Sequence, residues 1–116
     1  MRDGRREEAS SQHRAEHIRT TDMEQQIAVD IRIAVDSLRS ADEEVKVARE
    51  GLKLAEAELE QARRRYSNGV APSLEVTQAQ TELARARDDE VLALFHHVQA
   101  RIDLGQATGT LRNEIE

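Results

Sequence analysis

The stretch RRRYSNGVAPSLEVTQAQ, residues 63–80, is where the pattern of this chain breaks. It contains the single proline of the protein, Pro72, three residues after Gly69. Long charged stretches with few glycines lie on both sides. Proline is tolerated in the first turn of a helix, and glycine accepts the positive φ of a chain reversal. The stretch therefore predicts that one helix ends, the chain turns over residues 67–72, and a second helix begins.

The composition favours long helices over an ordinary globular core. Of the 116 residues, 38% are hydrophobic and 34% are charged, and Phe, Trp and Tyr together make up 2%. This is too little bulky apolar material for a conventional core, whereas a pair of long helices buries only a narrow stripe. The net charge of −6 excludes a basic surface for nucleic acid, so we expect no nucleic-acid partner.

Residues 1–8 lack the apolar segment of a signal peptide, so we expect none in this chain. No stretch approaches the ~20 apolar residues of a membrane-spanning helix, and we expect no direct membrane insertion. The absence of cysteine excludes disulfides and thiolate chemistry.

Before the break, apolar residues recur in alternating steps of four and three. This heptad seam predicts a helix over residues 22–66, and every second member from residue 34 is alanine, which lets a facing helix approach closely. A weaker stripe to one side, Ile33, Val47 and Leu54, indicates a further neighbour. The seam residues are Ile27, Ile31, Ala34, Leu38, Ala41, Val45, Ala48, Leu52, Ala55, Leu59, Ala62 and Tyr66.

Both ends of this first helix follow from local signals. Thr21 and Glu24 resemble a capping box, which predicts a start near residue 22. Residues 1–21 form a polar N-terminal extension, and because residues 5–20 contain neither glycine nor proline, the extension can also be helical.

After the break we expect a second helix over residues 73–108, with Pro72 in its first turn or Ser73 as its N-cap. Gly109 is a plausible C-cap, followed by a C-terminal tail of residues 109–116. The seam of this helix is expected to end at Glu90, beyond which the apolar surface widens. The seam comprises Val76, Ala79, Leu83 and Ala86, and the wider surface Val91, Leu92, Leu94, Phe95, Val98, Ile102 and Leu104.

Two long helices joined by so short a tip must run antiparallel. The predicted fold is all-α, a long antiparallel helical hairpin of the coiled-coil type. Its uncovered apolar flanks indicate that the hairpin works within a larger array of helices.

These residues resemble a known family. The tip Tyr66-Ser67-Asn68-Gly69 followed by Leu74-Glu75-Val76-Thr77-Gln78-Ala79-Gln80 is similar to the periplasmic hairpin of TolC-type outer-membrane efflux proteins. The alanine-spaced helix before it and the ending Ala107-Thr108-Gly109-Thr110-Leu111 share the resemblance, which covers roughly residues 15–112.

The resemblance implies a homotrimeric tunnel with a β-barrel in the outer membrane and an α-helical barrel in the periplasm. This chain would be a fragment of such a channel, its second hairpin. The channel is a passive conduit, which docks a periplasmic adaptor protein that connects it to an inner-membrane pump.

The resemblance also assigns roles at the tip. The segment that would meet the adaptor comprises Tyr66, Ser67, Asn68, Gly69, Val70, Ala71, Pro72 and Ser73. Gly69 matches the tip glycine of the family, and Tyr66 matches a tyrosine that helps to close the entrance. Glu75 and Gln78 are the candidate pore-lining residues, and Ala71 replaces a gating arginine of some members.

Two other readings remain open. The seam alone equally fits a stand-alone antiparallel coiled coil that serves oligomerisation or scaffolding. An enzyme or metal-binding bundle has little support, because no nucleophile–base spacing occurs and His13 with His17 supplies only two ligands. We expect no catalytic residues, no metal site and no cofactor.

Overall fold

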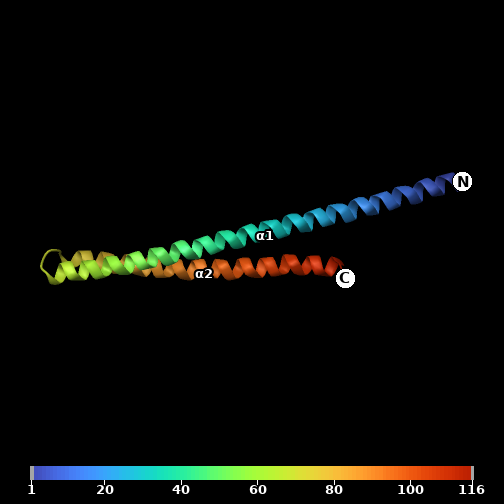
Figure 1. The fold of residues 1–116 in the computed structure, drawn as a ribbon. Coiled ribbons are helices and arrows are strands. Elements are labelled where there is room, and N and C mark those ends of the chain that lie inside the picture. The colour runs from blue at the N-terminus through green and yellow to red at the C-terminus, as the bar shows by residue number, and fades with distance from the viewer. Residues whose placement is uncertain (1, 116) are drawn as a thin grey trace.

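The computed structural model describes residues 2–115, which form two long helices joined by a short turn (Figure 1). Helix α1 spans Arg2–Ser67 and helix α2 spans Ser73–Ile115. The chain reverses between them, so that α2 lies antiparallel against α1 in a rod of 101 × 21 × 13 Å. The predicted all-α hairpin is confirmed, and residues 2–115 contain no strand.

Helix α1 is longer than the sequence predicts, because it begins at Arg2 rather than near residue 22. The capping-box interpretation was wrong for a local reason. The Thr21 hydroxyl donates to the carbonyl oxygen of His17, one turn back, at 3.0 Å, as Thr20 does to Glu16. A threonine that bonds backwards in this way lies inside a helix. The start of α1 therefore extends beyond the end of α2, and residues 3–20 are exposed.

Helix α2 is also longer than predicted, since it runs through Gly105 and Gly109 to Ile115. Gly109 is therefore not a C-cap, and residues 109–115 are helical rather than an irregular tail. A glycine inside a helix costs roughly 1 kcal/mol relative to alanine, which packing against a facing helix can offset. Leu104 and Ala107 are half-buried on either side of Gly105, so α2 is still packed at this level.

The heptad seam of α1 lies at the contact with α2, as its spacing predicts. Each seam residue from Ile27 to Ala62 is buried or half-buried. Tyr66 differs, with 53% of its surface exposed, because α1 ends one residue later and the chain turns away. A cluster of buried residues at this contact joins Ala55 and Leu59 of α1 to Leu83 of α2.

The seam of α2 continues past Glu90, where the sequence analysis ended it. Glu90 and His97 occupy positions where large apolar residues are expected, and both are half-buried. The alanines persist at every seventh residue through this region, and Ala93 has no exposed surface. The alanine series of α2 comprises Ala79, Ala86, Ala93, Ala100 and Ala107. The wider apolar surface expected beyond Glu90 is exposed, apart from Leu104, so the hairpin itself leaves it uncovered.

Enlarging a seam alanine should force the two helices apart. We expect Ala93→Leu to lower the free energy of unfolding by about 1–3 kcal/mol, because Ala93 is fully enclosed and the extra methyl groups have no space. Urea denaturation followed by circular dichroism measures this change. Ala57→Leu, at an exposed position of α1, is the control and should stay within about 0.5 kcal/mol of the parent. Equal stability of the two variants would contradict close packing at the alanine levels.

Candidate functional site

The tip of the hairpin is a Schellman turn built around Gly69. The N–H of Val70 donates to the carbonyl oxygen of Arg65 at 2.9 Å, and the N–H of Gly69 donates to that of Tyr66 at 3.0 Å. These two bonds satisfy carbonyls at the end of α1 that have no partner within the helix. Gly69 has a φ of 72°, the left-handed conformation that the turn requires, as the sequence predicted.

Pro72 lies immediately before the first residue of α2, Ser73. The Pro72 carbonyl oxygen accepts the N–H of Glu75 at 3.2 Å, so the chain enters the helix directly from the proline. Ser73 is thus the first helical residue rather than the N-cap, and its carbonyl oxygen accepts the Thr77 hydroxyl at 3.3 Å. The tip is short because the fixed φ of proline suits a helix start.

The tip exposes large apolar side chains. Tyr66 is 53% exposed, Val70 68% and Leu74 60%. Ala71 differs from its neighbours, because it is buried beneath the turn and only 8% of its surface is exposed. The other members of the predicted contact segment, Ser67, Asn68, Gly69, Pro72 and Ser73, are exposed. The structure thus brings the whole predicted segment together at one end of the rod, with Ala71 facing inward.

Glu75, a candidate pore residue, forms an ion pair across the tip. The Arg65 Nε lies 3.2 Å from the Glu75 Oε2, and the two side chains are 46% and 41% exposed. Arg65 and Glu75 are ten residues apart in sequence, so the pair exists only because the chain reverses. Gln78, one turn further along α2, is exposed. The carboxylate of Glu75 is therefore held by a cation of its own hairpin.

A second group of polar contacts joins the helices midway along the hairpin. His97 Nε2 lies 2.6 Å from Asp42 Oδ1, and His96 Nδ1 lies 2.8 Å from Glu44 Oε1. These contacts were not predicted from the sequence, because the seam of α2 was expected to end at Glu90, before either histidine. Continuing the alanine series past Glu90 would have placed His97 on the seam.

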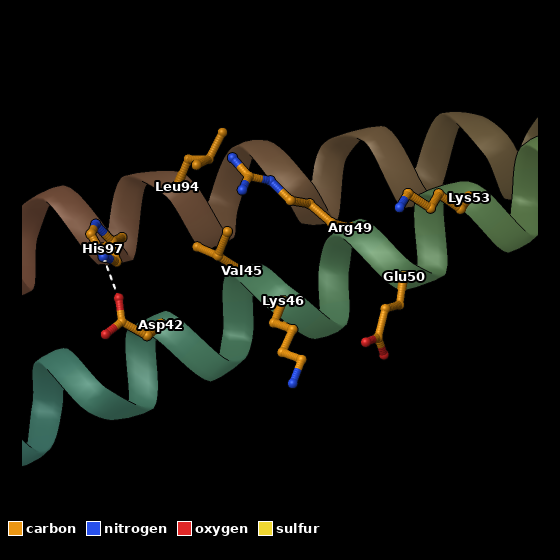
Figure 2. Close-up of a pocket in the computed structure, with 8 residues that line it drawn as sticks. All are labelled: Asp42, Val45, Lys46, Arg49, Glu50, Lys53, Leu94 and His97. Carbon is orange, nitrogen blue, oxygen red and sulfur yellow. Dashed lines mark hydrogen bonds and ion pairs between the residues drawn. The ribbon is translucent and has the colours of Figure 1, made fainter.

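An open groove lies between the helices beside His97 (Figure 2). Asp42 and His97 face each other across it, Arg49 reaches towards α2, and Lys46 and Glu50 point away. Val45, Lys53 and Leu94 complete the lining. Within residues 2–115, no cluster of three or more His, Asp or Glu side chains could hold a metal ion.

Neither helix, over the described range, has an apolar stretch long enough to cross a membrane. A family model described as "Outer membrane efflux protein" matches residues 1–110 of the chain. Comparison with curated proteins and with solved structures gives no match.

Replacement of Gly69 and of Gly105 by alanine should change the free energy of unfolding in opposite directions. An added Cβ would meet nothing within 4 Å at either position, so backbone conformation alone decides the effect. Gly69→Ala should lower the free energy of unfolding by about 1–2 kcal/mol, because the left-handed conformation strains an L-residue. Gly105→Ala, inside α2, should raise it by about 0.5–1 kcal/mol.

Thermal unfolding followed by circular dichroism compares the two variants. Gly69→Asn serves as a further check, since asparagine tolerates the left-handed region better than alanine and should lose less stability. Gly69→Pro should be the most damaging change, because proline cannot reach a φ of 72° and lacks the N–H that bonds Tyr66. Unchanged stability in Gly69→Pro would refute the turn described here.

The Arg65–Glu75 pair should contribute only weakly to the stability of the hairpin. A double-mutant cycle with Arg65→Ala and Glu75→Ala should give a coupling free energy of about 0.2–1 kcal/mol, because both side chains are partly solvated. Raising the salt concentration should reduce the coupling. A coupling that is large and independent of salt would show that the pair is shielded from water.

Proposed function

This chain belongs to the outer membrane efflux protein family, and we propose that its hairpin forms part of the wall of an export tunnel in the periplasm. The family comprises transport channels rather than enzymes. In the proposed assembly, α1 and α2 stand beside the helices of other hairpins as one sector of an α-helical barrel, and the channel is a homotrimer. It is a passive conduit of the outer membrane, and an inner-membrane pump supplies the energy.

The observation that supports this proposal best is apolar surface on the sides of the rod that the hairpin itself does not cover. Ile33, Val47 and Leu54 of α1 are each about 60% exposed, at 59%, 63% and 61%. Phe95 and Val91 of α2 are exposed at 63% and 65%. Large apolar side chains that recur along the sides of a solvated rod mark a surface that another protein covers. A barrel of adjacent hairpins covers both sides.

The alternative is a stand-alone antiparallel coiled coil for oligomerisation or scaffolding. The buried alanine seam is expected under both functions, so it does not separate them. The exposed rows favour the barrel, because a two-helix scaffold needs only its internal seam to be apolar.

The tip is proposed to dock a periplasmic adaptor protein. Tyr66, Val70 and Leu74 present apolar surface at the end of the rod, where no other part of the hairpin reaches. Large exposed apolar and aromatic side chains of this kind are the usual anchors of protein interfaces. The polar residues Ser67, Asn68 and Ser73 would form the rim of this contact.

Glu75 and Gln78 are proposed to line the pore at its entrance. Three copies of Glu75 converging on an axis would favour cations over anions. The Arg65 contact at 3.2 Å limits this effect, because each carboxylate already has a cation beside it. The proposed ring is therefore selective only to the extent that Arg65 turns away from the pore.

Polar substitution of the apolar tip should abolish export without disturbing the hairpin. We expect Tyr66→Asp with Val70→Asp, in the channel that carries this hairpin, to make cells that depend on it as sensitive to toxic compounds as cells without a channel. The reason is loss of the adaptor contact, since both side chains are exposed and contribute little to packing. Growth inhibition by a panel of compounds, with channel abundance checked by immunoblot, is the measurement.

Gln25→Asp, an exposed change on α1 far from the tip, is the control and should leave export intact. Full resistance of the tip variant at normal abundance would rule out tip docking. Unchanged resistance on deletion of the whole channel would favour the scaffold alternative.

A further inference from the structure

The tip of the hairpin carries the one Asn-Gly pair of the chain, Asn68-Gly69. The backbone nitrogen that follows an asparagine can attack the side-chain amide, because the two groups close into a cyclic imide. The attack is easiest when the next residue is glycine, which has no Cβ to crowd the nitrogen and adopts the widest range of backbone conformations. Both residues are exposed, and a Cβ added at Gly69 would meet nothing within 4 Å, so the approach to this peptide bond is open.

In the closed turn, hydrogen bonds to α1 hold the attacking nitrogen. The Gly69 N–H donates to the carbonyl oxygen of Tyr66 at 3.0 Å, and the Asn68 N–H donates to that of Arg64 at 3.0 Å. These bonds fix the peptide groups on both sides of the Asn68 Cα. To reach the Asn68 Cγ, the Gly69 nitrogen must rotate about the bond from this Cα to its carbonyl carbon, which breaks the bond to Tyr66. The turn therefore opposes a reaction that its own sequence favours.

We propose that Asn68 is a site of spontaneous deamidation, and that opening of the tip sets the rate of the reaction. The Gly69 nitrogen loses its proton to solvent and forms a bond with the Asn68 Cγ. The bond from Cγ to Nδ2 breaks, and Nδ2 takes up a proton and leaves as ammonia. Water then adds to either carbonyl carbon of the cyclic imide and opens it, which gives aspartate or isoaspartate at position 68. Nothing is oxidised or reduced, and water is the only co-reactant.

Either product changes the tip. Isoaspartate adds a carbon atom to the backbone inside the turn, so the two hydrogen bonds of the Schellman turn cannot both keep their geometry. Aspartate adds negative charge at the carbonyl end of α1, where the helix dipole disfavours it. Position 68 also lies three residues after Arg65, so an aspartate there competes with Glu75 for the guanidinium. The proposal concerns this chain alone and does not depend on the proposed tunnel.

Asn113, the other asparagine of the chain, provides an internal comparison. It is exposed, lies in α2 and is followed in the sequence by Glu114. A residue with a Cβ hinders attack by its own nitrogen, so Asn113 should react slowly even in the unfolded chain. The difference between the two asparagines in the unfolded chain therefore reports the sequence, whereas the difference between folded and unfolded Asn68 reports the turn.

Ageing of the 116-residue chain at mildly alkaline pH tests the proposal, with one sample folded and one unfolded in guanidinium chloride. Mass spectrometry of proteolytic peptides measures the exchange of NH₂ for OH at each asparagine. In denaturant, Asn68 should react faster than Asn113. In the folded chain, Asn68 should react about tenfold or more slowly than in denaturant, because only molecules with an open tip react.

Two results would overturn the proposal. Equal rates at Asn68 and Asn113 in denaturant would show that the Asn-Gly pair is not reactive. Equal rates at Asn68 with and without denaturant would show that the turn does not control the reaction.

Two variants at Val70 separate the effect of the turn from that of the sequence, because both keep the Asn-Gly pair. Val70→Pro removes the N–H that donates to the Arg65 carbonyl oxygen at 2.9 Å, whereas Val70→Ala keeps it. The Val70 side chain is 68% exposed, so its loss alone removes little packing. Without denaturant, Asn68 should deamidate about fivefold faster in Val70→Pro than in Val70→Ala, the effect of losing one backbone hydrogen bond.

Val70→Ala should react at the rate of the parent chain. Equal rates in the two Val70 variants would overturn control of the reaction by the turn. Circular dichroism checks that both variants remain helical, and if Val70→Pro unfolds, the comparison of the folded and unfolded parent still decides.

Asn68→Asp carries one of the two products and tests its effect on the tip. The coupling between Arg65 and Glu75, measured by a double-mutant cycle, should be smaller in Asn68→Asp than in Asn68→Ser, which adds no charge. Equal coupling in the two backgrounds would contradict competition for the Arg65 guanidinium.

Discussion

The close approach of two alanine series is the constraint on which the hairpin depends. Alanine recurs at every seventh residue from Ala34 to Ala62 in α1 and from Ala79 to Ala107 in α2. Within these series Ala93 is fully enclosed, and Ala41, Ala55, Ala62 and Ala100 are each at most 7% exposed. Helices that approach so closely need few bulky residues between them, which explains how a chain with 38% hydrophobic residues forms an ordered rod. Its larger apolar side chains are thereby left on the outside for other partners.

The strongest periodic signals predicted the fold. The errors, in the extent of the α2 seam and in the helix ends, arose where these signals are interrupted. The seam of α1 was predictable because no polar residue breaks it from Ile27 to Ala62. The seam of α2 was cut short at Glu90 because a carboxylate and later a histidine occupy large apolar positions, although the alanines continue. Helix ends were missed for a related reason. Thr21 and Gly109 carry local stop or start signals, but hydrogen bonding along the helix and packing against the partner helix override them.

At the tip, the role of Gly69 could be predicted from the sequence, whereas the Arg65–Glu75 contact could not. Gly69 was identified because only a residue tolerant of positive φ suits this reversal. The Arg65–Glu75 contact could not be found from spacing, since ten residues separate its members and their meeting depends on the geometry of the Schellman turn. This contact bears on the proposed pore-lining role of Glu75, because the Arg65 guanidinium already lies beside its carboxylate.

The alanine interface has a mechanical consequence. An alanine side chain has no alternative rotamers, so a small axial slide of one helix past the other needs no side-chain rearrangement. Resistance to such shear must come from contacts that cross the interface between the helices, or from the turn that joins them. In this rod these are the large seam residues between the alanine levels, such as Leu59 and Leu83, the Asp42–His97, Glu44–His96 and Arg65–Glu75 contacts, and the closed turn at Gly69. The hairpin should therefore resist splaying along its whole paired length yet yield to longitudinal shear, most readily where these anchors are farthest away.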